Sequence, residues 1–310
     1  MESRRHKSEF YNRIKIITTI LVVAGHVTTM YTSNGAIEVS RQSEFLSKLT
    51  EIIYSFHMPL FYLVTGAVFG YCIEAGKYKD SIAFIKNKWT KLMIPYLVFG
   101  IFYVTPIMKY VNLLSVSVPK YIVEGILLSR NPRHLWFLLS LFCIFLFYLP
   151  MKEWIRKGNW KYYLLVGIIS FIFYKAAYKM PQDFQIRRAC LDVLWFYGGI
   201  VFNHYYDKLF PIKEYKETNT ENRKTKLARK ASNGQRFDIW KIGVIKLIKR
   251  NSFGIYLIHP MVIYVLFYWF RESSIHPLLL SCFIFIMSMS ISILGTELMR
   301  KSGFKIIIGE

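Results

Sequence analysis

Apolar residues along this chain gather in long runs that alternate with shorter polar stretches. Most of the runs have roughly 17–22 residues, which is the length that a helix needs to cross about 30 Å of hydrocarbon. The pattern predicts eight helical membrane spans, near residues 14–32, 51–73, 91–109, 134–150, 161–178, 189–206, 252–270 and 277–297. We therefore expect an all-α, polytopic integral membrane protein, for which the lipid bilayer is the first partner.

The chain is strongly basic, with 41 Lys and Arg residues against 19 Asp and Glu residues. Most of the basic residues flank the predicted spans on one side, and the positive-inside rule makes that side cytoplasmic. Both termini are then cytoplasmic, and the net charge of +22 requires no nucleic-acid partner. The first apolar run has no small-residue cleavage site after it, so we expect a retained span and not a signal peptide.

Two segments interrupt the regular pattern. Between residues 110 and 133, Pro119 divides two short apolar stretches, which predicts a re-entrant or interfacial element on the outer side. The long polar segment at about 207–250 predicts a basic cytoplasmic loop within a single membrane domain of residues 1–310. At its end, Ile239–Ile248 has isoleucines at helical spacing with lysines between them. This spacing predicts an amphipathic helix on an anionic leaflet.

Histidines occur inside three of the apolar runs. Burial disfavours a charged imidazole, so a histidine within a membrane is expected to be neutral and to have a function. A rise of 1.5 Å per residue puts His26 about 18 Å from the inner edge and His57 about 9 Å from the outer edge, at similar depths. They predict a reaction centre inside the bilayer or, as the alternative, hydrogen bonds that join helices. His259 precedes Pro260, which allows a catalytic role or a bond to a carbonyl that the proline leaves free.

Three lysines lie at the predicted cytoplasmic ends of spans. Lys15 precedes His26 on the first helix, and Lys88 and Lys91 are three residues apart, on one helical face. Together they predict a site for an anionic cytosolic ligand. The alternative is that they only mark the cytoplasmic side.

Polar residues also open the fourth span on its predicted outer side. Arg133, His134 and Trp136 are suited to bind a sugar or a carboxylate by forked hydrogen bonds and stacking. The alternative is an interfacial anchor, because Trp and Arg are common at that depth. Lys175 and Asp192, near the outer ends of adjacent spans, are candidates for a structural ion pair.

Five short motifs follow one another along the chain. They are Lys15 with His26 after a ten-residue gap, Phe56-His57-Met58-Pro59-Leu60-Phe61 with Gly66, Lys88-x-x-Lys91 with Leu92-x-x-Pro95-Tyr96, His134-Leu135-Trp136-Phe137-Leu138, and Ile255-Tyr256-Leu257-Ile258-His259. In this order and spacing the chain resembles the membrane-bound acyltransferase 3 family, on its branch of fucose 4-O-acetylases and polysaccharide O-acyltransferases.

The resemblance implies a bundle of about 8–10 transmembrane helices. It also implies an acyl-CoA donor substrate, with acetyl-CoA favoured, that enters from the cytoplasm. The acceptor would be a hydroxyl of a cell-surface glycan or its lipid-linked precursor. His26 would act as general base, with His57 as a second catalytic residue. Lys15, Lys88 and Lys91 would hold the donor phosphates as point charges.

The remaining candidates are Arg133, His134, Trp136, His259 and Asn12, which would bind the acceptor or support the structure. Asn12 stands where the family usually has Asp, so it supplies a hydrogen bond but no negative charge. We expect no bound cofactor and no metal, because the sequence has no Gly-rich phosphate loop and no metal-type cysteine pair.

The basic, isoleucine-rich composition favours a bacterial source and a multi-pass protein of the cytoplasmic membrane, in which the glycan-synthesis machinery is a candidate partner. Two other functions stay open. A transporter or flippase for a glycan intermediate would need a polar path with charges near the midplane or broken helices. A catalytically degenerate family member would act as a scaffold.

Overall fold

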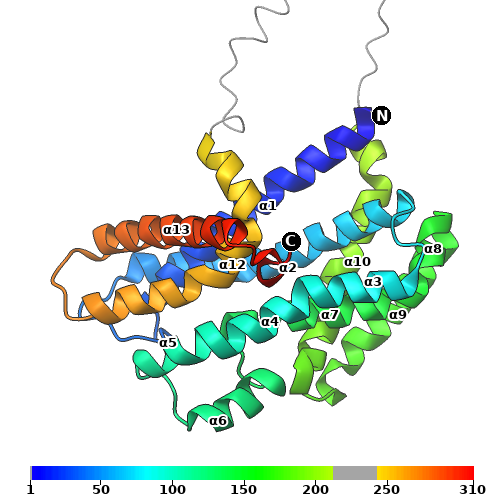
Figure 1. The fold of residues 1–310 in the computed structure, drawn as a ribbon. Helices are drawn as coiled ribbons and strands as arrows, with labels where there is room; N and C mark the ends of the chain where they lie inside the picture. The colour runs from blue at the N-terminus through cyan, green and yellow to red at the C-terminus, as the bar shows by residue number, and fades with distance from the viewer. Residues whose placement is uncertain (1, 212–242) are drawn as a thin grey trace, which may run out of the picture.

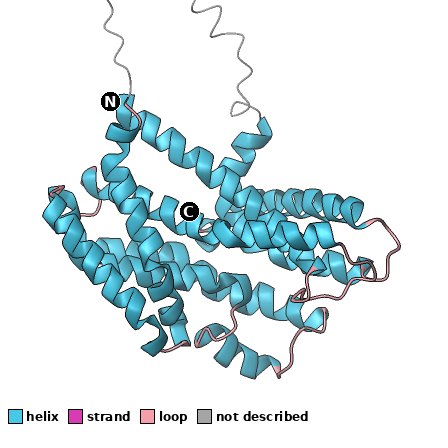
Figure 2. Ribbon diagram, turned by 180° about the vertical axis from the view of Figure 1, so that it is seen from behind, coloured by secondary structure: helices cyan, strands magenta, loops and turns pink. Residues whose placement is uncertain are grey.

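The computed structural model of the chain describes residues 2–211 and 243–310. Helices make up nearly all of this described part, and it contains no strand (Figure 2). In Figure 1, α12 and α13 lie on one side of the bundle, and α8, α9 and α10 lie on the other. The bounds of these and the other long elements are α1 (Glu2–Thr28), α2 (Glu44–Glu74), α3 (Ser81–Lys88), α7 (Trp136–Tyr148), α8 (Lys152–Lys157), α9 (Trp160–Ala176), α10 (Ile186–Leu209), α12 (Gly243–Phe270) and α13 (Pro277–Lys301).

Each of the eight predicted spans falls on a helix, and most of these helices are longer than predicted. Six helical stretches are long and apolar enough to cross a membrane, which confirms the all-α, multi-pass class. They are His6–Tyr31, Glu44–Glu74, Ser81–Tyr110, Arg133–Lys157, Gly243–Phe270 and Pro277–Lys301.

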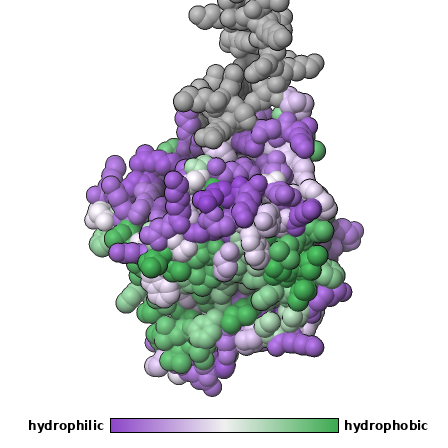
Figure 3. Space-filling model, turned by 90° about the vertical axis from the view of Figure 1, so that its right-hand side faces the viewer, coloured by the Kyte–Doolittle hydropathy of each residue, from purple (hydrophilic) through white to green (hydrophobic). Residues whose placement is uncertain are grey.

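The other two predicted spans do not meet that standard, so the predicted number of eight is not reproduced. The helix α9 has only 17 residues. The helix α10 has 24 residues, but Asp192, Asn203 and His204 lie along it and reduce its hydropathy. Between the exposed lysines near its two ends, Lys161 and Lys175, the exposed residues of α9 are nonetheless mainly apolar, as on a surface that faces lipid: Leu164, Leu165, Ile168, Phe171 and Ile172. Figure 3 likewise shows a broad hydrophobic band below a strongly hydrophilic end of the molecule.

Prolines widen the third span at two points. It continues from α3 through a π-turn η2 (Trp89–Met93), α4 (Ile94–Phe99) and a second π-turn η3 (Gly100–Val104) to α5 (Thr105–Tyr110). In each π-turn the residue before a proline donates its N–H to a carbonyl five residues back. Proline has no N–H for the i→i−4 hydrogen bond of an α-helix. A wider turn with an i→i−5 hydrogen bond therefore forms at each proline. The second turn also directs Tyr103, whose hydroxyl donates to the carbonyl of Ile258 on α12 at 2.9 Å.

The first and tenth helices are antiparallel, and polar contacts fix their register. The Tyr11 hydroxyl donates to Oδ1 of Asn203 at 3.0 Å, and Lys7 pairs with Asp207 at 2.9 Å. In Figure 1 the start of α1 accordingly lies beside the end of α10. Fifteen residues separate Tyr11 from His26 and also Arg188 from Asn203, so both intervals cover about 22 Å of helix. His26 and Arg188 therefore come to the same level of the bundle.

The segment between residues 110 and 133 contains a short helical element. It is formed by α6 (Val118–Lys120) and the π-turn η4 (Tyr121–Leu127), which together are too short to cross a bilayer. The Tyr96 hydroxyl joins it to the third span by a hydrogen bond of 2.6 Å to the carbonyl of Ile126. The element therefore does not supply an additional span, and its re-entrant or interfacial placement stays a prediction.

The predicted basic loop lies mostly outside the described residues. Of the predicted amphipathic segment Ile239–Ile248, the described part belongs to the start of α12 and continues directly into the span. The cytoplasmic placement of both termini stays a prediction.

The last described residues form a short 3-10 turn, η10 (Lys305–Ile308), that is tied to α13. The guanidinium of Arg300, only 10% exposed, binds the carboxylate of Glu310 and also pairs with Glu297 at 2.8 Å. Glu297 and Arg300 are three residues apart on α13, the spacing at which oppositely charged side chains of one helix meet. The hydrogen bond from Arg300 lowers the pKa of Glu310 below its ordinary value of 4.5.

Replacing Glu310 with Gln is expected to lower the unfolding temperature by about 1–3 °C at pH 7. Because the folded-state pKa is depressed, the ion pair stabilises the fold above pH 4.5 and stops doing so as the pH falls through the folded pKa. Thermal unfolding of both proteins in detergent, from pH 7 downwards, measures the difference. A difference that grows on acidification would contradict this account.

Candidate active site

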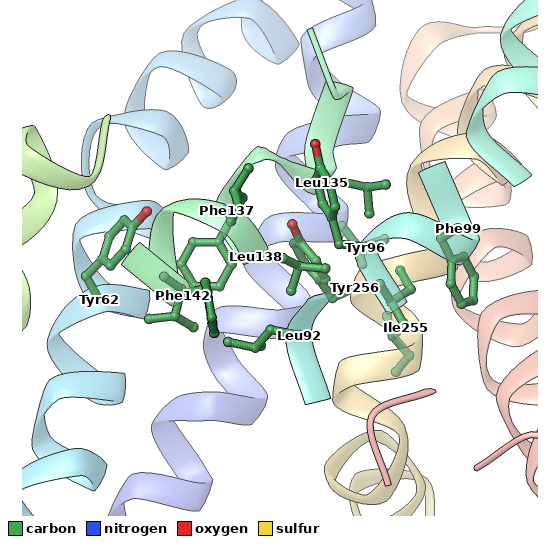
Figure 4. Packing of buried hydrophobic residues seen from close by; sticks show 14 of the residues in the cluster. Tyr62, Leu92, Tyr96, Phe99, Leu135, Phe137, Leu138, Phe142, Ile255 and Tyr256 are labelled. Atoms are coloured by element: carbon green, nitrogen blue, oxygen red, sulfur yellow. The ribbon is translucent and has the colours of Figure 1, made fainter. Parts of the chain in front are cut away.

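A cavity of about 400 Å³ lies where five helical elements of the bundle meet. Its walls come from α1, α2, α7 with the preceding turn η5 (Arg133–Leu135), α10 and α12. Its lining residues are Val22, His26, Tyr54, Ser55, His57, Met58, Pro59, His134, Trp136, Phe137, Arg188, Asp192 and Tyr256. Hydrophobic side chains from α2, α4, α7 and α12 pack closely together next to it, as Figure 4 shows for Tyr62, Phe137 and Tyr256. Phe137 and Tyr256 also line the cavity.

Prolines inside two helices help to form this polar space. Pro59 lies within α2 and leaves the carbonyl of Ser55 without its helical donor, and both residues line the cavity. Pro260 within α12 does the same for the carbonyl of Tyr256, which also lines it. Free backbone carbonyls are tolerated inside a membrane protein where they line a cavity.

The structure brings the predicted histidines together. His26, His57 and His134 all line the cavity. His259 lies directly behind them and is completely buried, with its ring centroid 5.1 Å from that of His26 and 6.3 Å from that of His134. Tyr54 joins the group between His57 and His26, at 4.7 and 6.4 Å between ring centroids. His26 and His57 therefore line one cavity, as their predicted similar depths allow, and the depths in the membrane stay predictions.

Backbone carbonyls determine the tautomers of two histidines. Nδ1 of His57 lies 2.8 Å from the carbonyl oxygen of Ile53, and Nδ1 of His259 lies 2.6 Å from that of Ile255. A carbonyl only accepts, so each Nδ1 is a donor, and Nε2 of the neutral ring is left with a lone pair. The carbonyl that His259 occupies is thus that of Ile255, next to the one that Pro260 frees.

His134 is oriented in the opposite sense. Its Nε2 donates to the carbonyl oxygen of Leu257 at 3.1 Å, which leaves the lone pair on Nδ1. The Tyr256 hydroxyl donates to the backbone carbonyl of His134 and holds this turn against α12. Nδ1 of His134 and Nε2 of His259 are buried and have no hydrogen-bond partner among the described residues. Buried polar atoms without a partner are rare in native structures, and a catalytic role is one of the reasons for which they are retained.

A charged pair completes the cavity wall. Nε of Arg188 donates to Oδ2 of Asp192 at 2.7 Å, and the guanidinium lies over the ring of Trp136 at 4.5 Å from its centroid. The suggested partner of Asp192, Lys175, instead has its ammonium over the ring of Phe171. The ion-pair prediction for Lys175 is therefore wrong, because the i,i+4 arginine on the same helix reaches Asp192 first.

Arg188 was absent from the candidates predicted from the sequence. The signal that would have found it is the Arg-x-x-x-Asp spacing at the start of a span, where a charge inside an apolar run requires a partner.

Other predicted site residues do not reach the cavity. Arg133 has a positive φ of 52°, which turns its side chain away from that of His134. It lines a separate pocket of about 170 Å³, together with Tyr121, Glu124 and Arg130. Arg130 pairs with Asp183 at 2.7 Å and lowers the pKa of that carboxyl.

The three lysines and Asn12 also lie away from the cavity. Lys15 and Lys91 are exposed. The Lys88 ammonium lies 4.1 Å from the ring centroid of Phe145 and farther from two other rings, those of Tyr78 and Phe84 (5.5 and 5.4 Å). No ion pair joins any of these lysines to a carboxylate within residues 2–211 and 243–310. Asn12 is half-buried near the start of α1, about 21 Å along the helix from His26.

The fold and the cavity together define a multi-pass helical membrane protein with a histidine-lined polar site inside its bundle. The sequence matches an acyltransferase domain over residues 9–213 and 227–297, which is most of the chain. The protein belongs to the acyltransferase 3 family and is a membrane acyltransferase in general class. Neither a curated protein nor a solved structure matches it. In the described part of the chain, no group of three His, Cys, Asp or Glu side chains is arranged to hold a metal ion.

Proposed function

We propose that this protein is a membrane O-acyltransferase that moves an acyl group from acyl-CoA to a sugar hydroxyl. Of the possible acyl groups, acetyl is the one that we favour. The acceptor is a cell-surface glycan or its lipid-linked precursor, and the whole of residues 1–310 acts as one domain in a bacterial cytoplasmic membrane. The observation that most supports this proposal is the contact of His26 with both the cavity and His259. It provides a neutral base next to a space that admits a small polar substrate.

In this proposal His26 is the general base. As the acceptor oxygen attacks the thioester carbonyl carbon, its proton passes to His26, the C–S bond breaks, and CoA leaves as a thiolate that takes up a proton. The products are an ester and a free thiol. Nε2 of His259 has a lone pair without a hydrogen-bond partner in the described part of the chain, and its ring lies 5.1 Å from that of His26 between centroids. In this proposal that lone pair accepts an N–H from His26 during the reaction, which orients the ring and stabilises the imidazolium. Nε2 of His57 accepts a hydrogen bond from a second hydroxyl of the sugar substrate.

The donor site is proposed at the lysines. The phosphates of CoA carry several negative charges, and Lys15, Lys88 and Lys91 offer cations with no carboxylate partner in the described part of the chain. Eleven residues separate Lys15 from His26, a distance of about 16 Å along the helix. The extended pantetheine arm of the donor would have to cross this distance to bring the thioester to His26.

The test is the release of free CoA thiol in membranes that contain the protein, supplied with acetyl-CoA and a panel of sugar acceptors. An acyltransferase releases thiol in proportion to the acceptor acylated. A transporter or flippase would move a glycan intermediate and consume no acyl-CoA. A scaffold would do neither, and restoration of Asp at position 12 would not change that.

A further inference from the structure

The Arg188–Asp192 pair is the charged feature of the cavity wall, and the proposed chemistry assigns no task to it. Both residues line the cavity, with Arg188 43% exposed and Asp192 8% exposed. The Arg188 guanidinium lies over the ring of Trp136, 4.5 Å from its centroid, and is also bonded to Asp192, so two neighbours hold it in place. An ion pair within a bilayer is costly and is most often retained for binding or transport.

Each partner has atoms that the pair itself does not use. The hydrogen bond joins Nε of Arg188 to Oδ2 of Asp192. The two terminal guanidinium nitrogens, which only donate, and the second carboxylate oxygen, which only accepts, are not part of it. A donor and an acceptor thus lie side by side on the wall of the cavity.

The level of the pair in the bundle matches that of the proposed base. The contacts between α1 and α10 place Arg188 and His26 at the same height, on different helices that border one cavity. A ligand held at Arg188 and Asp192 can therefore present another of its groups to His26.

We propose that Arg188 and Asp192 form the acceptor subsite and bind two vicinal hydroxyls of an uncharged sugar. One hydroxyl accepts a hydrogen bond from a terminal nitrogen of Arg188. The adjacent hydroxyl of the sugar donates a hydrogen bond to Oδ1 of Asp192. This rests on the proposed function, because it assigns the acceptor of that same reaction. Among the lining residues other than histidine, these two alone are charged, and they neutralise each other. A uronate or phosphate would approach the Asp192 carboxylate without a net positive charge to attract it.

The arrangement also determines the role of Trp136. A free indole face would favour stacking of a sugar ring. Here the guanidinium of Arg188 covers one face, so the indole positions the arginine and the hydrogen bonds select the sugar.

The experiment compares the wild type with Arg188→Lys and Asp192→Asn, using acetyl-CoA and the methyl glycosides of neutral hexoses, their monodeoxy analogues and the matching uronates. Lysine at position 188 keeps the positive charge but loses the planar, forked set of N–H donors. Asparagine at position 192 keeps the shape of the side chain but loses the negative charge. In the wild type, removal of one of the two bound hydroxyls is expected to raise KM by about 10- to 100-fold, with a smaller change in kcat. In the variants that discrimination should nearly vanish, because the partner of the hydroxyl is already lost.

Arg187→Lys is the matched control. Arg187 is the neighbouring arginine on α10, but it donates to the carbonyl of Met180 and does not line the cavity. It should leave the deoxy-sugar discrimination unchanged. A purely structural role of Arg188 would lower activity equally for every acceptor, so retained discrimination in Arg188→Lys would overturn the proposal, as would a preference for the uronates.

Binding of the same glycosides to purified protein in nanodiscs, measured by equilibrium dialysis, separates this inference from the proposed reaction. Discrimination that depends on Arg188 in the absence of any CoA release would support the subsite and refute the acyltransferase. CoA release that depends on His26, together with binding that Arg188→Lys leaves unchanged, would refute the subsite alone.

Discussion

Replacement of His26 with alanine is expected to reduce acceptor-dependent release of CoA by about 100- to 10,000-fold, the usual contribution of a general base. The ring faces the cavity and touches His259, whose free lone pair can orient it. Alanine removes the proton acceptor and leaves the cavity open to substrates. The measurement is the rate of thiol release in membranes with equal amounts of the two proteins.

A matched control is His204→Ala. His204 lies on α10, near Glu74 and the ring of Tyr163, and it does not line the cavity. It should leave thiol release close to the wild-type rate. If His26→Ala is folded and keeps full activity, the base is another group. If neither the wild type nor the variant releases thiol with any acceptor, the result favours the transporter and scaffold hypotheses. The next variant to test would then be Asn12→Asp.

Helical periodicity predicted the part of this site that depends on depth alone. His26 and His57 reach one cavity because each lies at a fixed height on a continuous helix, and a rise of 1.5 Å per residue is enough to calculate that height. The class of fold was also predictable from the sequence, because long apolar runs of this length rarely form anything other than membrane-spanning helices. The order of the motifs added the family, which the match to residues 9–213 and 227–297 then showed.

What the sequence could not predict depends on how helices face one another. Lys88 lies among aromatic rings from three segments, and no local pattern links Tyr78, Phe84 and Phe145. Arg133 and His134 are neighbours in sequence but face different pockets, because one residue in the left-handed region redirects the chain. A sequence pattern also does not predict the distance between two helices, which for α2 and α10 is set by glycines.

Replacement of Gly199 with alanine is expected to abolish most folded protein, because α2 and α10 approach at this point with no room for a side chain. A Cβ at Gly199 would lie 1.9 Å from the carbonyl oxygen of Leu63 and 2.7 Å from the backbone nitrogen of Ala67. Across the same crossing, a Cβ at Gly66 would lie 2.0 Å from the carbonyl oxygen of Phe196. Backbone atoms cannot rotate away as a side chain does, so the helices themselves must separate, at a cost at or above the roughly 1–3 kcal/mol of ordinary overpacking.

Gly198→Ala is the control, since a Cβ at this adjacent position meets nothing within 4 Å. Both changes gain the same helix propensity, about 1 kcal/mol in favour of alanine, so a comparison of the two variants isolates the clash. The yield of monodisperse protein after detergent extraction and its unfolding temperature measure the outcome. If Gly199→Ala is as stable as Gly198→Ala, the two helices are not in backbone contact. Because α2 provides His57 and α10 provides Arg188, such a result would also remove the geometric basis for placing these side chains around one cavity.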